Sequence, residues 1–209
     1  KGRLYTARAD SLQRRSAQTV MYEALNSLVR LMAPILAFTA EDIWQYMPKR
    51  SCDKAAASVH LLDWPALNME GAGFSPKDTV DISHLDAVMR FIPAATKALE
   101  EKRSSGMIGS SFDAKINILT KDQNRYNYLD GLRADLAEIF KVSQVAVTKT
   151  DTLEARPPID ADNPDASLEV HKADGRKCDR CWNYTDTVGK DPSHPALCGQ
   201  CVAAIQGGK

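Results

Sequence analysis

The stretch Lys177-Cys178-Asp179-Arg180-Cys181-Trp182, followed by Leu197-Cys198-Gly199-Gln200-Cys201, holds four of the five cysteines of this 209-residue chain. Two Cys-x-x-Cys pairs are separated by sixteen residues, a spacing typical of four-thiolate zinc sites. Each pair can present two sulfurs along one edge of a tetrahedron, and two pairs complete it. Because four thiolates leave no coordination position open, the sequence predicts one structural Zn²⁺ ion rather than a catalytic one, bound by Cys178, Cys181, Cys198 and Cys201.

Two other uses of these cysteines fit the sequence less well. A thiol redox motif usually comes singly and beside a βαβ unit, and a secreted disulfide framework would not leave the rest of a large chain nearly free of cysteine. The fifth cysteine, Cys52, has no evident base beside it and is expected to be inert. Thiolate ligands favour a reducing compartment, so a cytoplasmic location is expected.

The overall composition is that of an ordinary globular protein, with 44% hydrophobic and 26% charged residues and a formal net charge of zero. The first 50 residues hold eight Lys and Arg against four Asp and Glu, and the middle of the chain is acidic. The apolar run 31–39 is too short to span a membrane, so no membrane partner is expected. Lys1 is not an initiator Met, and a fragment of a longer protein is expected.

Residues 1–65 are predicted to form a mainly helical domain. Apolar residues recur at helical spacing over 11–33, where Pro34 ends the pattern, and a second helix is expected from Thr39 to Pro48. The stretch 58–65 is predicted to be extended. Residues 66–80 are rich in Gly, Pro and Asp, which indicates a linker and a domain boundary.

Residues 81–149 are predicted to form a small α/β subdomain. Helices are expected at 82–103, kinked or split by Pro93, and at 126–140, with strands at 114–119 and 142–148. Residues 150–170 are acidic and proline-bearing and are expected to be a linker that ends in a short strand. The zinc module then occupies 171–209 and is too small to fold without its metal.

Several stretches resemble the class I aminoacyl-tRNA synthetases. Residues 3–44, which include Arg14-Arg-Ser-Ala-Gln-Thr19 and Ala33-Pro-Ile-Leu-Ala-Phe-Thr-Ala-Glu-Asp42, resemble their helical anticodon-binding domain. Residues 59–65 and 98–115 resemble the segments that follow it. Lys177-Cys-Asp-Arg-Cys-Trp-Asn-Tyr184 with Cys198-Gly-Gln-Cys201 resembles the C-terminal zinc finger of the bacterial isoleucyl enzymes.

This resemblance implies a multidomain, mainly α protein with a helical anticodon-binding domain (1–65), a small α/β subdomain (81–149) and a four-cysteine finger. It implies tRNA(Ile) as partner, beside the catalytic and editing domains of the same polypeptide in a monomeric parent. ATP and Mg²⁺ would bind only in that catalytic domain, because the His-x-Gly-His and Lys-Met-Ser-Lys-Ser signatures do not occur here. The fragment alone is expected to be inactive.

Candidate tRNA contacts follow from the way proteins hold RNA. Basic side chains bind phosphates, and aromatic rings stack on unpaired bases. The expected contacts are Trp182, Arg180 and Lys177 in the finger and Arg14, Arg15 and Arg30 in the first helix. For four of these residues a plainer role stays open: Trp182 could pack on the metal cage, Arg180 could cover the metal, and Arg14 and Arg15 could be a solvated helix face.

Two other functions stay open at this point. The finger also resembles that of formamidopyrimidine-DNA glycosylases, which would make it a DNA-binding module. Alternatively, the finger could be a purely structural docking domain that touches no RNA.

Overall fold

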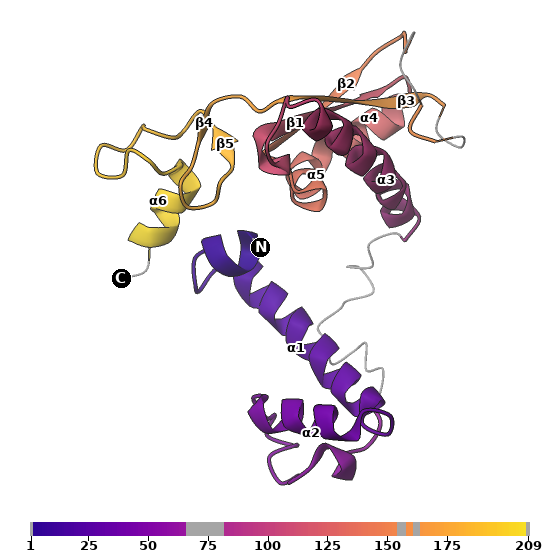
Figure 1. Ribbon diagram of the computed structural model, residues 1–209, viewed down its shortest axis with the longest axis vertical. Coiled ribbons are helices and arrows are strands. Elements are labelled where there is room, and N and C mark those ends of the chain that lie inside the picture. The colour runs from indigo at the N-terminus through magenta and orange to yellow at the C-terminus, as the bar shows by residue number, and fades with distance from the viewer. Residues whose placement is uncertain (1, 66–81, 154–157, 161–163, 208–209) are drawn as a thin grey trace. The chain divides into compact units, whose positions relative to one another are not determined.

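The computed structural model describes residues 2–65, 82–153, 158–160 and 164–207 (Figure 1). The chain forms two compact units, one of residues 9–79 and one of residues 1–8 with 80–209. The predicted linker 66–80 lies outside the described residues, as do 154–157 and 161–163 of the expected linker 150–170. The predicted fold class is confirmed: helices dominate, and a small sheet and a four-cysteine cluster accompany them.

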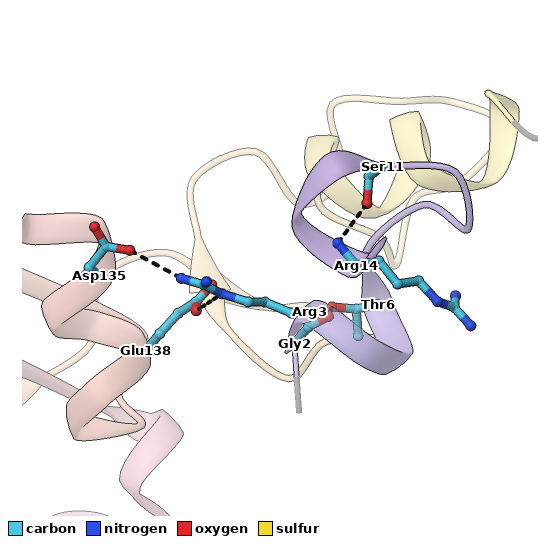
Figure 2. A network of polar contacts seen from close by, with 7 residues as sticks. All are labelled: Gly2, Arg3, Thr6, Ser11, Arg14, Asp135 and Glu138. Atoms are coloured by element: carbon cyan, nitrogen blue, oxygen red, sulfur yellow. Dashed lines mark hydrogen bonds and ion pairs between the residues drawn. The ribbon is translucent and has the colours of Figure 1, made fainter. Parts of the chain in front are cut away.

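The described part of the first unit contains two α-helices. Helix α1 spans Leu12–Met32, and the side chain of Ser11 caps it by accepting a hydrogen bond from the backbone N–H of Arg14 (Figure 2). Helix α2 spans Ala37–Tyr46. Both helices lie within two residues of the predicted ranges. Ser11 and Pro34 mark the ends of α1, whereas α2 begins at Ala37 without a side-chain cap.

The core of this unit is small. It consists of Val29 and Ala33 from α1 and its end, Ala40, Trp44 and Met47 from α2 and its end, and Val59. Several apolar residues of α1 that were expected to be buried are instead more than half exposed, among them Val20, Met21 and Leu28. Helix α1 therefore buries only one part of its apolar surface against α2.

The stretch 58–65 is not extended throughout, as the sequence suggested, because Val59–Leu61 forms a turn of 3₁₀-helix. The Ser58 hydroxyl accepts from the N–H of His60 and donates to Glu41, which also accepts from the N–H of Val59. Such local side-chain bonds compete with an extended backbone. These bonds explain why the backbone turns at Val59–Leu61 although the sequence predicted an extended stretch.

The second unit contains a three-stranded sheet with the strand order β2-β1-β3. Strand β1 (Ala114–Thr120) pairs in parallel with β2 (Gln144–Lys149) and antiparallel with β3 (Ala166–Lys172). Helices α3 (Ile82–Ser104), α4 (Gln123–Gly131) and α5 (Arg133–Phe140) cover one face of the sheet (Figure 1). Their shared core contains Phe91, Ile116, Ile118, Leu129 and Leu136.

Three elements of this unit refine the expectations. Helix α3 is not split at Pro93 but continues through it as one helix. The predicted helix 126–140 is two helices that meet at Leu132, directly after Gly131, and Asp122 starts the first by capping the N–H of Arg125. Strand β3 begins inside the expected linker 150–170 and belongs to the sheet, because its backbone satisfies the free edge of β1.

The finger follows β3 directly. It contains a two-stranded ribbon, β4 (Arg176–Lys177) with β5 (Tyr184–Thr185), and helix α6 (Gly199–Gln206). The N-terminal turn η1 (Gly2–Thr6) belongs to this same compact unit. Across the described residues, the helices are all too short or too polar to cross a membrane.

Candidate metal centre

The four predicted cysteines converge at one place in the finger. Their sulfur atoms all lie within 4.8 Å of one another, and the Sγ atoms of Cys181 and Cys198 are 3.8 Å apart. A tetrahedral zinc site with Zn–S bonds of about 2.3 Å has sulfur–sulfur edges of about 3.8 Å. The donor set and its size therefore fit one zinc ion, with no position left for a substrate.

Backbone N–H groups prepare the first cysteine to act as a thiolate. Burial by itself raises the pKa of Cys178, but the N–H groups of Cys181, Cys198 and Arg180 point at its sulfur and outweigh burial. The pKa falls to about 6. The turn after Cys178 thus supplies part of the stabilisation that a metal-bound thiolate needs.

Two of the other cysteines hold their protons more tightly. Burial raises the pKa of Cys201 to about 11, against the effect of the Arg180 guanidinium, which donates to its sulfur over 3.6 Å. Burial, with the neighbouring cysteines, also raises the pKa of Cys181. Since zinc competes with protons for these thiols, metal binding at this site should release protons.

Trp182 directly follows the second ligand and has an unusual backbone. Its φ angle is +69°, in the left-handed region, and its N–H donates to the carbonyl of Cys178. A residue with a Cβ atom pays about 1–2 kcal/mol for this conformation. The indole is 49% exposed and is not part of the apolar cluster around the sulfurs, which consists of the four cysteines with Val188 and Leu197.

Polar contacts fix the finger to the sheet. The Ser143 hydroxyl accepts from the N–H of Tyr184 at 2.7 Å, and the Gln144 side chain pairs with both backbone groups of Asp174. Asp113 accepts from two loop N–H groups, and its other oxygen lies 3.8 Å from the ammonium of Lys177. The finger is therefore mounted on the α/β subdomain rather than joined to it by a chain segment alone.

The N-terminal segment is also anchored within this unit. The Arg3 guanidinium lies 2.7 Å from the carboxylate of Glu138 and 3.2 Å from that of Asp135, both on α5. Figure 2 shows these contacts. The Arg180 guanidinium donates to the carbonyls of Thr6 and Tyr5. The hydrogen bonds that the structure shows for the Arg180 guanidinium therefore all go to atoms of this protein.

The remaining predicted contacts lie on α1, in the other unit. Arg15 is exposed and lines an open depression of about 280 Å³ with Gln18, Thr19 and Tyr22. Arg14 is half-buried. Arg30 is largely buried: its guanidinium pairs with Asp53 at 2.7 Å and with Asn26 at 3.3 Å.

The sequence did not reveal the residues that hold Arg30 and the finger in place. Asp53 pairs with Arg30 across 23 positions, and Ser143 meets Tyr184 across 41. Neither pair shares a spacing that a sequence pattern could reveal. Only Asp113 carried a local signal, since Ser110 and Asp113 have the spacing of a capping box.

Comparison with known protein families finds a match for the first half of the chain and another for the finger. The anticodon-binding domain of tRNA ligase matches residues 1–118, and the zinc finger found in FPG and IleRS matches residues 175–204. The second match contains all four cysteines of the metal centre.

Similar proteins named isoleucine–tRNA ligase occur in several bacteria. That of Gloeobacter violaceus is 42% identical over 207 residues, which cover 99% of this chain and 20% of that protein. That of Syntrophotalea carbinolica is 38% identical over 206 residues, covering 98% and 21%. The chain thus spans about a fifth of the length of these relatives. With more than half of its residues in the first match, the chain belongs to the family of anticodon-binding domains of tRNA ligases.

Proposed function

We propose that this chain is the anticodon-side, tRNA-binding C-terminal region of an isoleucine–tRNA ligase. The observation that carries the proposal is the order of parts in one chain: an anticodon-binding domain followed by a finger of the kind found in IleRS. The parent would charge tRNA(Ile) with isoleucine through an ATP-dependent aminoacyl-adenylate. ATP and Mg²⁺ would bind in its catalytic domain, outside these residues.

In this proposal, zinc supplies the finger with its fold, and the finger presents Trp182 to RNA. Strained backbone tends to occur where function demands it, and the left-handed backbone at Trp182 places a half-exposed indole beside the cage. An unpaired base that stacks on such a ring contributes about 1–3 kcal/mol. The alternative role of Trp182, packing on the metal cage, fits its exposure less well.

Phosphate contacts would come from side chains that remain accessible. Arg15 on α1 and Lys177 in the finger are exposed, and we include Arg14 beside them. Arg30 and Arg180 hydrogen-bond to protein atoms, so here they act by holding neighbouring residues. Binding through phosphates releases counterions, so the affinity should fall steeply with salt.

The remaining four-fifths of the parent would meet this chain on the apolar part of α1. Val20, Met21 and Leu28 form an exposed apolar stripe there, and such stripes mark interaction surfaces in soluble proteins. We infer that the catalytic or editing domain of the same polypeptide covers it. A monomeric, cytoplasmic parent completes the proposal.

A DNA-binding role for the finger is the second candidate, because the matched zinc-finger family also includes that of FPG, the formamidopyrimidine-DNA glycosylases. The match of residues 1–118 to an anticodon-binding domain favours RNA. Tighter binding of duplex DNA than of tRNA would support this second candidate.

The proposal is tested by replacing Trp182 with Gly and with Phe in the zinc-loaded protein. Glycine suits a φ of +69°, so Trp182→Gly should keep zinc and leave the finger at least as stable. Loss of stacking should weaken tRNA binding by about 5- to 150-fold, and Trp182→Phe should retain most of the affinity. Lys190→Ala, which removes an exposed charge from the finger, is the control. Unchanged tRNA affinity in Trp182→Gly would refute the stacking role.

A further inference from the structure

Arg180 occupies the position between Cys178 and Cys181, and its guanidinium reaches in two directions. Its Nη1 lies 3.6 Å from the sulfur of Cys201, one of the four ligands, and 2.5 Å from the carbonyl oxygen of Thr6. Its Nη2 lies 3.4 Å from the carbonyl oxygen of Tyr5. One side chain thus touches both the metal centre and a segment more than 170 residues away.

The two carbonyls are suitable acceptors. They stand at the end of the turn η1, where the last carbonyls of a helical segment lack partners within it. A cation is favoured at such an end, and a planar guanidinium can serve several acceptors at once. The Arg180 side chain therefore caps this turn.

The segment 2–8 is held on a second side as well. Arg3 pairs with Asp135 and Glu138 of α5 (Figure 2). At the C-terminal end of α6, a Cβ atom on Gly207 would lie 2.5 Å from Nη1 of Arg8. Residues 2–8 therefore lie between α5 and the finger, with contacts to both.

We propose that Arg180 is a positioning residue that couples the metal centre to the segment 2–8. A zinc ion bound by four thiolates leaves a net charge of −2, which one guanidinium partly offsets. The metal also fixes the turn on which Arg180 sits. Loading the site with zinc would then order the segment that leads into α1, and removing zinc would release it. This coupling needs no RNA contact and goes beyond the proposed function.

Hydrogen exchange of the peptide that covers residues 2–8 tests the coupling. Arg180→Ala should speed its exchange about tenfold with zinc still bound, because a charge-assisted hydrogen bond is lost. Removing zinc from the unsubstituted protein with a chelator should have a similar effect, and the same treatment of Arg180→Ala should add little. Lys190→Ala, which also removes a positive charge from the finger, should leave the exchange unchanged.

A second variant keeps the test decisive if Arg180→Ala fails to hold zinc. Arg180→Lys keeps the charge near Cys201, but an ammonium cannot bridge the sulfur and two carbonyls. It should keep one zinc per chain and still show faster exchange in residues 2–8. Two results would overturn the proposal. One is zinc-loaded Arg180→Lys whose residues 2–8 exchange at the rate of the unsubstituted protein. The other is a segment 2–8 that stays protected after zinc is removed.

Discussion

At the scale of single residues, two arginines that look alike in the sequence have different surroundings. Arg15 is exposed on α1, whereas the side chain of Arg30 is only 13% exposed and bonds to Asp53 and Asn26. Breaking a buried ion pair leaves an uncompensated charge, which costs far more than losing an exposed pair. Arg30 therefore serves the stability of the helical unit.

This difference gives a prediction for unfolding. Arg30→Ala should lower the free energy of unfolding of the helical unit by about 3 kcal/mol, because Asp53 is left buried and unpaired. Glu23→Ala, which removes the exposed pair with Arg50 in the same unit, should cost less than about 1 kcal/mol. Urea unfolding followed by circular dichroism measures both. Equal losses of unfolding free energy for the two substitutions would show that the buried Arg30–Asp53 pair contributes no more stability than the exposed pair.

At the scale of elements, the finger and the sheet are joined through the loop that precedes β1. The carboxylate of Asp113 accepts from the N–H groups of Gly109 and Ser110, and Lys177 of the finger lies beside it. Burial raises the pKa of Asp113, but these two N–H groups and the Lys177 ammonium outweigh it, so the pKa lies below its ordinary value of 3.8. Asp113 thus stabilises the fold in its ionised form.

The sign of this shift predicts an effect of pH. A lowered pKa contributes stability above the ordinary value and loses it as the pH falls below about 4. Asp113→Asn should therefore cost about 1 kcal/mol at neutral pH, and the difference from the unsubstituted protein should shrink towards pH 3. Asp186→Asn, at an exposed site, is the control. A difference that stays constant between pH 7 and pH 3 would argue against this role of the carboxylate.

The elements also show what a sequence can and cannot reveal. The cysteines of each Cys-x-x-Cys turn are neighbours in the chain, so their spacing predicted the metal centre. The contacts Arg180–Thr6 and Ser143–Tyr184 join distant segments, and no local pattern encodes them. A short strand was expected at the end of the segment 150–170, but its start at Ala166 and its pairing with β1 are set by the sheet, not by its own composition.

At the scale of the whole molecule, the residues that the structure describes form three apolar clusters of unequal size. The cluster in the α/β subdomain is the largest, and the cluster of the finger consists mainly of the cysteines. A module of this size cannot bury enough apolar surface to fold without its metal. Loss of zinc should therefore unfold the finger and leave the α/β core folded.

This division predicts the effect of single cysteine substitutions. Cys178→Ser should lose zinc and the hydrogen-exchange protection of α6, while the protection of β1 persists. Cys52→Ser removes the exposed cysteine of the helical unit and should keep one zinc per chain. Metal analysis with hydrogen exchange measures both. A Cys178→Ser protein that keeps stoichiometric zinc would rule out the four-cysteine site.

In the proposed function, this chain holds the anticodon side of an isoleucine-accepting tRNA. The most direct measurement is the affinity of the zinc-loaded protein for tRNA(Ile), in competition with a non-cognate tRNA and with duplex DNA, over a range of salt concentrations. We expect tRNA(Ile) to bind most tightly, its affinity to fall as salt rises, and a chelator to weaken it. Equal affinity for all three nucleic acids, or tighter binding of DNA, would contradict the proposed function.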